Sequence, residues 1–190
     1  WKSRGLGDVY KRQDLVDFAS KRQLKIGSTQ TREEEILGAN NKEELARLYK
    51  ALIALNIEAA KKKGVILKDE ASCFVEGQLK VGKDVRIGSN VTIKGSVSLG
   101  NNVCIESNVV LCNTKVGDDT TIKDFCSIED SVLAKNVEVG PFARLRNGAV
   151  LDDSAKVGNF VEIKKSKIGQ CSKANHHAYL GDYNIGKNVN

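Results

Sequence analysis

The stretch VGKDVR-IGSNVT-IKGSVS-LGNNVC-IESNVV, residues 81–110, divides into five consecutive steps of six residues. The same phase continues to the end of the chain, with five-residue steps at 111–115, 128–132, 163–167 and 180–184. Apart from the step that opens with Ala174, every step between Val81 and Ile185 opens with Ile, Leu or Val. A register kept this strictly indicates a repeat architecture.

The positions within each step indicate what the repeat folds into. The fifth residue of most six-residue steps is Val, Thr, Ala or Cys, and it lies two residues before the aliphatic residue that opens the next step. Residues two apart in a strand point to the same face, so both face inward. Gly, Asn and Asp fill the second to fourth positions, where the chain turns a corner. Short strand and corner in alternation predict a parallel β-helix, with three steps in each coil and about six coils in all.

The segment before the repeat has a helical pattern. Asn41 precedes Lys42-Glu43-Glu44 as an N-cap with a glutamate at the third helical position, and Gly64 is placed to end the helix. We predict a connecting helix over 41–64, and a stripe at Leu45, Leu48, Leu52 and Leu55 marks its expected packing face. Lys61–Lys63 stand at its C-terminus, where cations are favoured, and this interpretation is preferred over phosphate binding.

The N-terminal residues do not belong to this pattern. Residues 1–13 resemble a translated sequencing adaptor, and we interpret them as a non-native scar. Residues 14–40 are too short for a domain of their own and are expected to be the tail of one. The β-helix is assigned to 65–190, and because the pattern stops without a closing element, we expect the sequence to be an internal fragment of a longer protein.

Composition excludes several classes of function. The chain has 190 residues, a net charge of +6 and mixed charges without a long basic run that contains aromatics, so nucleic-acid binding is disfavoured. No run of about 20 apolar residues and no signal peptide is visible, which argues against a membrane protein. The five cysteines form no CxxC pair, and free thiols in a reducing cytosol are the expected state, so the predicted location is cytoplasmic.

The coil length predicts which outward side chains stack. Arg146 and Lys164 are both second in their steps, and three steps separate them, so one lies directly above the other. Two like charges in this arrangement are unfavourable unless an anion binds there. The alternative is that Glu162 or Asp152 neutralises them, and the spacing alone does not decide between a phosphate or carboxylate site and a neutralised surface.

A second column and the two histidines lie near this pair. Arg144, Glu162 and Tyr179 each end a step. His176 and His177 are adjacent in ANHHAY, and because neighbouring residues on an extended chain point apart, a shared metal ion is not expected. One histidine beside an anion site suits a general base, and a structural or merely exposed histidine is the alternative.

Four segments carry a resemblance to a known family. VGPFARLRNGA, VGNFVEIKKSKIGQCSKANHHAYLGD and IGKNVN resemble the acetyltransferase domain of the bifunctional bacterial N-acetylglucosamine-1-phosphate uridyltransferase and glucosamine-1-phosphate acetyltransferase. ILGANNKEELARLYK resembles the junction between the nucleotidyltransferase domain of that family and its connecting helix. The resemblance covers about residues 14–190. It implies a left-handed β-helix, a cytoplasmic homotrimer with active sites between subunits, and acetyl transfer from acetyl-CoA to glucosamine-1-phosphate.

The resemblance also implies roles for individual residues. His176 matches the general base, and His177 has no matched role. The implied sugar-phosphate contacts are four residues: Arg146, Lys164, Tyr179 and Asn190. Asn40 matches an asparagine that binds the sugar nucleotide and Mg²⁺ in the uridyltransferase domain.

Departures from the family restrict what this chain is expected to do. The Gly-rich nucleotide loop, the acidic metal site and the main acetyl-CoA residues of the family are absent from the sequence, which predicts the acceptor half of one site and little of the donor half. Two alternatives belong to other classes: a sugar-phosphate nucleotidyltransferase whose β-helix serves regulation or assembly, and a structural β-helix module. The structural module predicts a flat, repetitive polar face, which the irregular Arg, Lys, His and Tyr residues do not match.

Overall fold

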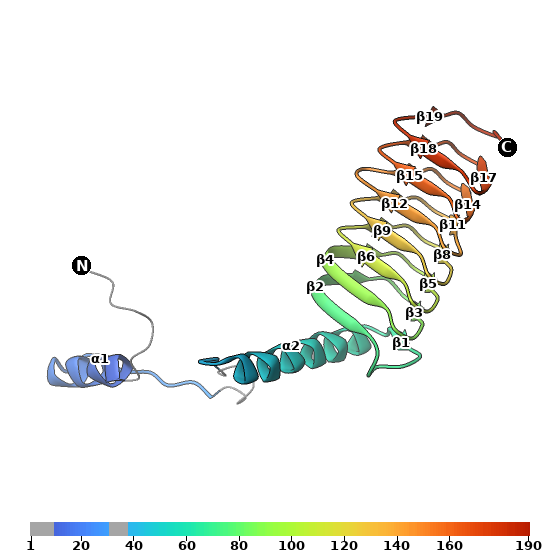
Figure 1. Ribbon diagram of the computed structural model, residues 1–190. Helices are drawn as coiled ribbons and strands as arrows, with labels where there is room; N and C mark the ends of the chain where they lie inside the picture. The colour runs from blue at the N-terminus through green and yellow to red at the C-terminus, as the bar shows by residue number, and fades with distance from the viewer. Residues whose placement is uncertain (1–9, 31–37) are drawn as a thin grey trace.

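The computed structural model describes residues 10–30 and 38–190. Two helices precede the strands, α1 (Tyr10–Lys21) and α2 (Lys42–Lys62). The boundary predicted between residues 13 and 14 falls inside α1, and the residues before Tyr10 lie outside the described part. The strands form a parallel β-helix that rises from the end of α2, as Figure 1 shows.

One face of the β-helix is a seven-stranded parallel sheet in which each strand pairs with its counterpart one coil away. Its strands, in spatial order, are β1 (Ile66–Leu67), β3 (Arg86–Ile87), β5 (Cys104–Ile105), β8 (Thr121–Ile122), β11 (Glu138–Val139), β14 (Lys156–Asn159) and β17 (Lys173–His176).

The other two faces are joined into one sheet by a long strand. The second face holds β2 (Phe74–Val81), β4 (Thr92–Leu99), β6 (Val110–Cys112), β9 (Ser127–Glu129), β12 (Arg144–Arg146), β15 (Glu162–Lys164) and β18 (Tyr179–Gly181). The third holds β7 (Lys115–Val116), β10 (Val132–Leu133), β13 (Val150–Leu151), β16 (Lys167–Ile168) and β19 (Asn184–Ile185). The first half of β4 pairs with β6 and its second half with β7, so β4 continues around a corner that later coils interrupt. Gly95 lies at this bend with φ +63, a conformation that glycine adopts without a steric penalty.

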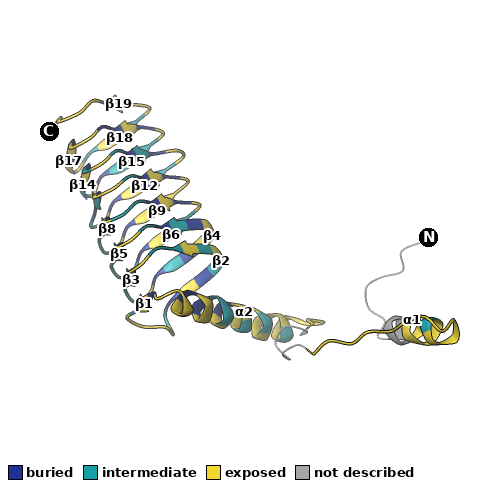
Figure 2. Cartoon of the chain, turned by 180° about the vertical axis from the view of Figure 1, so that it is seen from behind, coloured by how far each residue is buried: buried dark blue, intermediate teal, exposed yellow. Residues whose placement is uncertain are grey.

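The inward positions are those that the step pattern predicts. Side chains that are fully buried come from step openings and fifth positions, for example Leu145, Ala149, Leu151 and Ala155. Figure 2 shows buried and exposed residues alternating along the coils. Three of the four five-residue steps turn a hydroxyl inward, at Thr114, Ser131 and Ser166; Ser166 is 3% exposed and donates to the Leu180 carbonyl at 3.2 Å. Buried polar groups are tolerated when they are hydrogen-bonded in this way.

The β-helix begins one coil earlier than the six-residue steps suggest. β1 lies before Val81, and β2 ends at that residue. Ile66 of β1 pairs with Arg86 of β3, whereas Arg86 pairs with Cys104 of β5, so the first coil is longer than the second. Because the longer first coil lacks the six-residue spacing, counting six-residue steps does not detect it.

Helix α2 starts and ends where its sequence predicts but packs with a different face. The Asn41 side chain accepts from the Glu44 amide at 2.8 Å, which caps the first turn. Leu45 and Leu52 are more than half exposed, so the leucine stripe is not the packing face. The buried residues are Ile53, Ile57 and Ala60. The Asn56 amide donates to the Val75 carbonyl of β2 at 2.7 Å, and this bond fixes which side of the helix faces the first coil.

Candidate functional site

The candidate site is built on the second face, where β12, β15 and β18 lie on consecutive coils. β12 and β15 pair with Arg144 opposite Glu162 and Arg146 opposite Lys164. β15 and β18 pair with Glu162 opposite Tyr179 and Lys164 opposite Gly181. The two columns that coil length predicts are therefore present. Arg146 and Lys164 are both partly buried, which keeps part of their charge out of bulk water.

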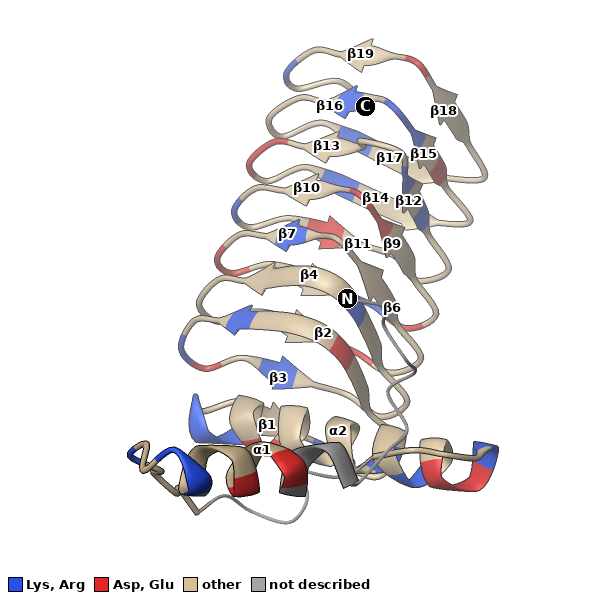
Figure 3. Cartoon of the chain, turned by 90° about the vertical axis from the view of Figure 1, so that its left-hand side faces the viewer, with Lys and Arg blue, Asp and Glu red and all other residues tan. Residues whose placement is uncertain are grey.

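Glu162 neutralises one of the two stacked cations. Its Oε1 lies 2.7 Å from the Arg146 Nε and 3.7 Å from the Arg144 guanidinium. Asp152 does not take part, because it pairs with Lys167 on the third face at 3.0 Å. Lys164 forms no ion pair with any residue that the structure describes. Figure 3 shows charges of both signs along the β-helix. At this site Arg144, Arg146 and Lys164 outnumber the one carboxylate, Glu162.

Tyr179 lies across the position above Lys164. A Cβ placed on Gly181 would lie 2.6 Å from the Tyr179 hydroxyl oxygen and 2.8 Å from its ring carbons. The phenol ring therefore occupies the space that a side chain at position 181 would take. Because Gly181 is the coil partner of Lys164, the hydroxyl is brought to the column of the two cations. Sequence reasoning did not identify Gly181 as part of the site, although it stands in the YLGD segment.

The two histidines lie at the end of β17 and at the corner that follows it. The ring centroids of His176 and His177 are 5.9 Å apart and the rings are nearly perpendicular, at 88°. The two rings are therefore in edge-to-face contact, and His177 has φ +47, which is not an extended conformation. The expectation that the two side chains point apart was wrong for this reason. Among the described residues, no group of three or more His, Cys, Asp or Glu is placed to hold a metal ion.

His176 is separated from the cation pair by this corner. In the described part of the chain it makes no hydrogen bond with Arg146, Lys164 or Tyr179. Asn190, another predicted contact, lies beside the same strand, since its side-chain oxygen accepts from the Asn175 amide at 3.1 Å. The structure thus places Asn190 beside Asn175, the residue before His176. It places the Tyr179 ring over Gly181, the coil partner of Lys164.

Asn40 is far from these residues and has a local role at the start of α2. Its backbone N–H donates to the Glu44 carboxylate at 2.7 Å, and its amide nitrogen donates to the same oxygen at 3.3 Å. The first of these bonds is the main cause of the lowered pKa of Glu44. A single exposed amide does not supply the oxygen ligands that Mg²⁺ requires. The described residues around Asn40 therefore do not fit a magnesium site.

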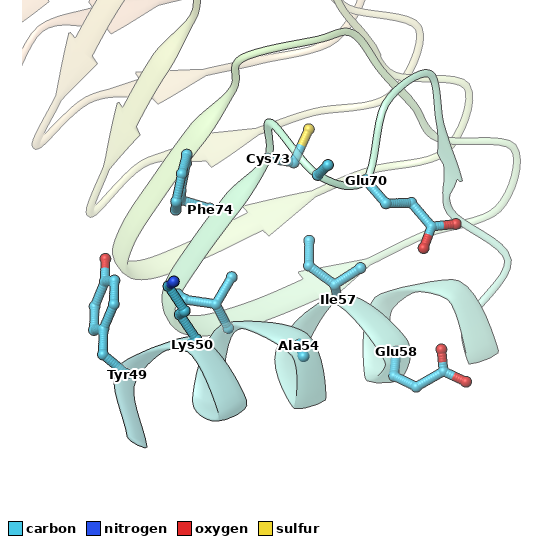
Figure 4. A pocket seen from close by; sticks show the side chains of 10 residues that line it. Tyr49, Lys50, Ala54, Ile57, Glu58, Glu70, Cys73 and Phe74 are labelled. Carbon is cyan, nitrogen blue, oxygen red and sulfur yellow. The ribbon is translucent and has the colours of Figure 1, made fainter. Parts of the chain in front are cut away.

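A large hollow lies at the other end of the β-helix. It has a volume of about 680 Å³ and lies between α2 and the first coil, as Figure 4 shows. Apolar side chains such as Ile57 and Phe74 line it, and Tyr49 lies at one end, where its hydroxyl donates to Glu76. None of the predicted site residues line this hollow. The candidate site is therefore the one on the second face, where strand pairing brings Arg146 and Lys164 together. None of the described helices is both long and apolar enough to cross a membrane.

A family model described as "EIF2B subunit epsilon LbH domain" matches residues 58–163, which is more than half of the chain. LbH stands for left-handed β-helix, the handedness that the sequence resemblance implies. The chain belongs to this family of left-handed β-helix domains.

More specific relatives extend the match beyond these residues. The "Bifunctional protein GlmU" of Chromobacterium violaceum is 41% identical over 156 residues, which cover 82% of this chain and 34% of the relative. The protein of the same name from Thermosipho melanesiensis is 46% identical over 157 residues, covering 83% of this chain and 35% of the relative. The chain is thus homologous to GlmU proteins and spans about a third of their length.

Among solved structures, a variant of perosamine N-acetyltransferase from Caulobacter crescentus in complex with CoA and GDP-perosamine is similar over 86% of this chain and 68% of its own. The identity is 17% and the TM-score is 0.29, and values this low support no conclusion about function.

Proposed function

We propose that this chain carries the acceptor part of an acetyltransferase site that transfers an acetyl group from acetyl-CoA to the amine of glucosamine-1-phosphate. The observation that carries the proposal is the convergence of Arg146, Lys164 and Tyr179 on one column of the second face. Two cations and a hydroxyl in one place suit a phosphate monoester, which accepts several charge-assisted hydrogen bonds. The homology to GlmU proteins supports the same class of reaction.

The proposed chemistry requires a base for the substrate amine. The amine nitrogen attacks the thioester carbonyl carbon and forms the new C–N bond, and the C–S bond to coenzyme A then breaks. The ammonium proton passes to His176, and the imidazolium then gives this proton to the departing thiolate, which restores the neutral base. A neutral imidazole at the end of β17 is suited to accept this proton. Asn190, beside Asn175, is proposed as a further contact to the sugar phosphate.

The wider setting of the reaction is also a proposal. The family resemblance implies a homotrimer in the cytoplasm, with each site completed by a neighbouring subunit. It also implies that the whole protein transfers a uridylyl group with Mg²⁺ in a separate domain. The described residues around Asn40 do not fit that ion, and we derive no step through it.

The proposal is tested by acetyl-CoA-dependent thiol release with glucosamine-1-phosphate, measured on the purified chain after circular dichroism confirms the β structure. His176→Ala is expected to lower turnover by about 10²- to 10⁴-fold. A loss below tenfold in an active chain would refute the role of His176. If the folded chain is inactive, direct binding of glucosamine-1-phosphate decides whether the acceptor site is present.

The phosphate contacts are tested separately from the base. Arg146→Ala and Lys164→Ala are expected to weaken acceptor binding and to leave turnover at saturation nearly unchanged. Lys167→Ala is the matched control, since it removes the same charge from the third face, where Lys167 pairs with Asp152. Equal effects of all three variants would indicate a general charge effect and exclude a specific clamp.

A further inference from the structure

One corner of the β-helix carries the same unusual backbone conformation in successive coils. The residues at this corner all have φ between +47 and +61, and they are Asn90, Asn108, Phe125, Phe142, Phe160 and His177. Asparagine and, less often, histidine adopt this left-handed conformation, whereas phenylalanine rarely does. The change from Asn to Phe along the corner therefore needs a compensating interaction.

The compensating interaction is a continuous stack of rings, which we call the aromatic ladder (Phe125, Phe142, Phe160 and His177). The centroid distances are 4.8 Å between Phe125 and Phe142, 5.2 Å between Phe142 and Phe160, and 5.0 Å between Phe160 and His177. The interplanar angles are 1°, 17° and 22°. These values lie in the range of favourable aromatic contacts. His177 is thus the last ring of a ladder that reaches back three coils.

His177 is held from two sides. Its backbone N–H donates to the Asn159 carbonyl at 3.1 Å, and the same type of bond joins Phe142 to Asp124 at 3.1 Å. Its ring face is covered by Phe160. The ring of His176 then meets it in a perpendicular contact, with centroids 5.9 Å apart. His176 itself is exposed, and this ring contact limits the directions its side chain can take.

We infer that His177 is a positioning residue that fixes the orientation of the His176 imidazole through the aromatic ladder. The inference deepens the proposed function, because it rests on His176 being the base. A base must be held in a productive direction toward the proton it accepts, and a small misplacement can cost a large part of the rate. His177 touches no substrate atom in this scheme and acts through its neighbour.

The corner itself supplies matched substitutions. His177→Asn keeps a residue suited to positive φ, as at Asn90 and Asn108, and removes the ring. His177→Phe keeps the ring and continues the ladder, as at Phe160. Both variants are expected to fold, because each residue already occupies this corner in another coil. A difference between them reports on the ring alone.

The chain contains only two histidines, so the imidazole C–H signals in a carbon-13 correlated NMR spectrum come from these two residues. In His177→Asn, the His176 signals are expected to lose their ring-current shift, and its side-chain coupling constants should change to averaged values. In His177→Phe, a single orientation of His176 should be retained. Unchanged His176 shifts and couplings in the Asn variant would overturn the inference.

The kinetic measurement distinguishes this inference from the proposed function. In acetyl transfer, kcat is expected to fall about tenfold or more in His177→Asn and to be largely restored in His177→Phe, with the acceptor KM unchanged. Loss of the His176 orientation without any loss of kcat would also overturn the positioning role. If His176→Ala itself leaves turnover intact, the proposed function fails, and the NMR result still decides whether His177 orients His176.

Discussion

Gly158→Ala is expected to move the strand that carries His176. Gly158 lies in β14, and a Cβ there would lie 1.6 Å from the Asn175 carbonyl oxygen in β17, whereas real Cβ atoms essentially never approach another atom within 3.0 Å. The atom it meets is backbone, so the two coils must separate. The neighbouring bonds from Lys156 to Ser172, at 2.9 Å, and from His177 to Asn159, at 3.1 Å, would lengthen.

The magnitude follows from these contacts. Overpacking costs about 1–3 kcal/mol, and each weakened hydrogen bond adds about 1 kcal/mol. The smaller backbone freedom of alanine in the unfolded state returns about 0.4–1 kcal/mol. We expect the free energy of unfolding to fall by about 2–4 kcal/mol in denaturant titrations, with faster hydrogen exchange at the His177 amide. Acetyl transfer should decrease mainly in kcat.

Gly181→Ala is the matched control for this experiment. The same added methyl group meets the Tyr179 hydroxyl and ring, which belong to an exposed side chain that can rotate away. The free energy of unfolding should stay within about 1 kcal/mol of the wild type. The acceptor KM should rise about as much as in Tyr179→Ala. If Gly181→Ala destabilised the protein as much as Gly158→Ala, the distinction between backbone and side-chain contact would be wrong.

Three further outcomes are expected from the fold and its charges. Ile163→Ala removes a fully buried side chain between Glu162 and Lys164 and should lower the free energy of unfolding by about 2–5 kcal/mol, whereas Val132→Ala, at a side chain 43% exposed, should cost less than about 1 kcal/mol in the same titration. The hydrogen bond from Lys123, together with the charges of Lys123 and Lys156, lowers the pKa of Glu138 below its ordinary value of 4.5. The stability that this carboxylate contributes is present above pH 4.5 and is lost as the pH falls through the lowered pKa. Acid denaturation should therefore depend less on pH in Glu138→Gln. Burial raises the pKa of the Cys126 thiol to about 11, so mass spectrometry after alkylation at about pH 8 should find exposed Cys171 labelled and Cys126 unlabelled unless the protein is unfolded.

The β-helix could be predicted from the sequence because its inward positions recur with the backbone period. Once Leu145 and Leu151 are known to open steps, burial at Ala149 follows from strand alternation. The count of six-residue steps missed the first coil, since the longer offset from Ile66 to Arg86 breaks the period, although the domain assigned from residue 65 includes it. The packing face of α2 was missed because the helix has two apolar stripes, and the bond from Asn56 to Val75 selects between them.

In the candidate site too, the features set by backbone register could be predicted, and those set by side-chain conformation could not. Pairing of Arg146 with Lys164 follows from counting residues along the coil, because register is a property of the backbone. The position of the Tyr179 ring over Gly181 and the stacking of His177 on Phe160 depend on side-chain rotamers and on a left-handed corner. The aliphatic step pattern does not encode these side-chain conformations. The recurrence of Phe at residues 125, 142 and 160, one coil apart, is a separate signal from which the aromatic ladder could have been predicted.

The two cations of the proposed clamp are unequal, and this follows from where Glu162 lies. Two like charges opposite each other on adjacent strands repel, and a carboxylate within 2.7 Å of Arg146 relieves this repulsion on one side only. Lys164 keeps its charge available and has the Tyr179 hydroxyl beside its coil partner Gly181. An anion therefore gains more from Lys164, where it displaces no ion pair, than from Arg146, where it competes with Glu162. In the proposed site, the phosphate lies toward β18, which is the next strand after His176 along the chain.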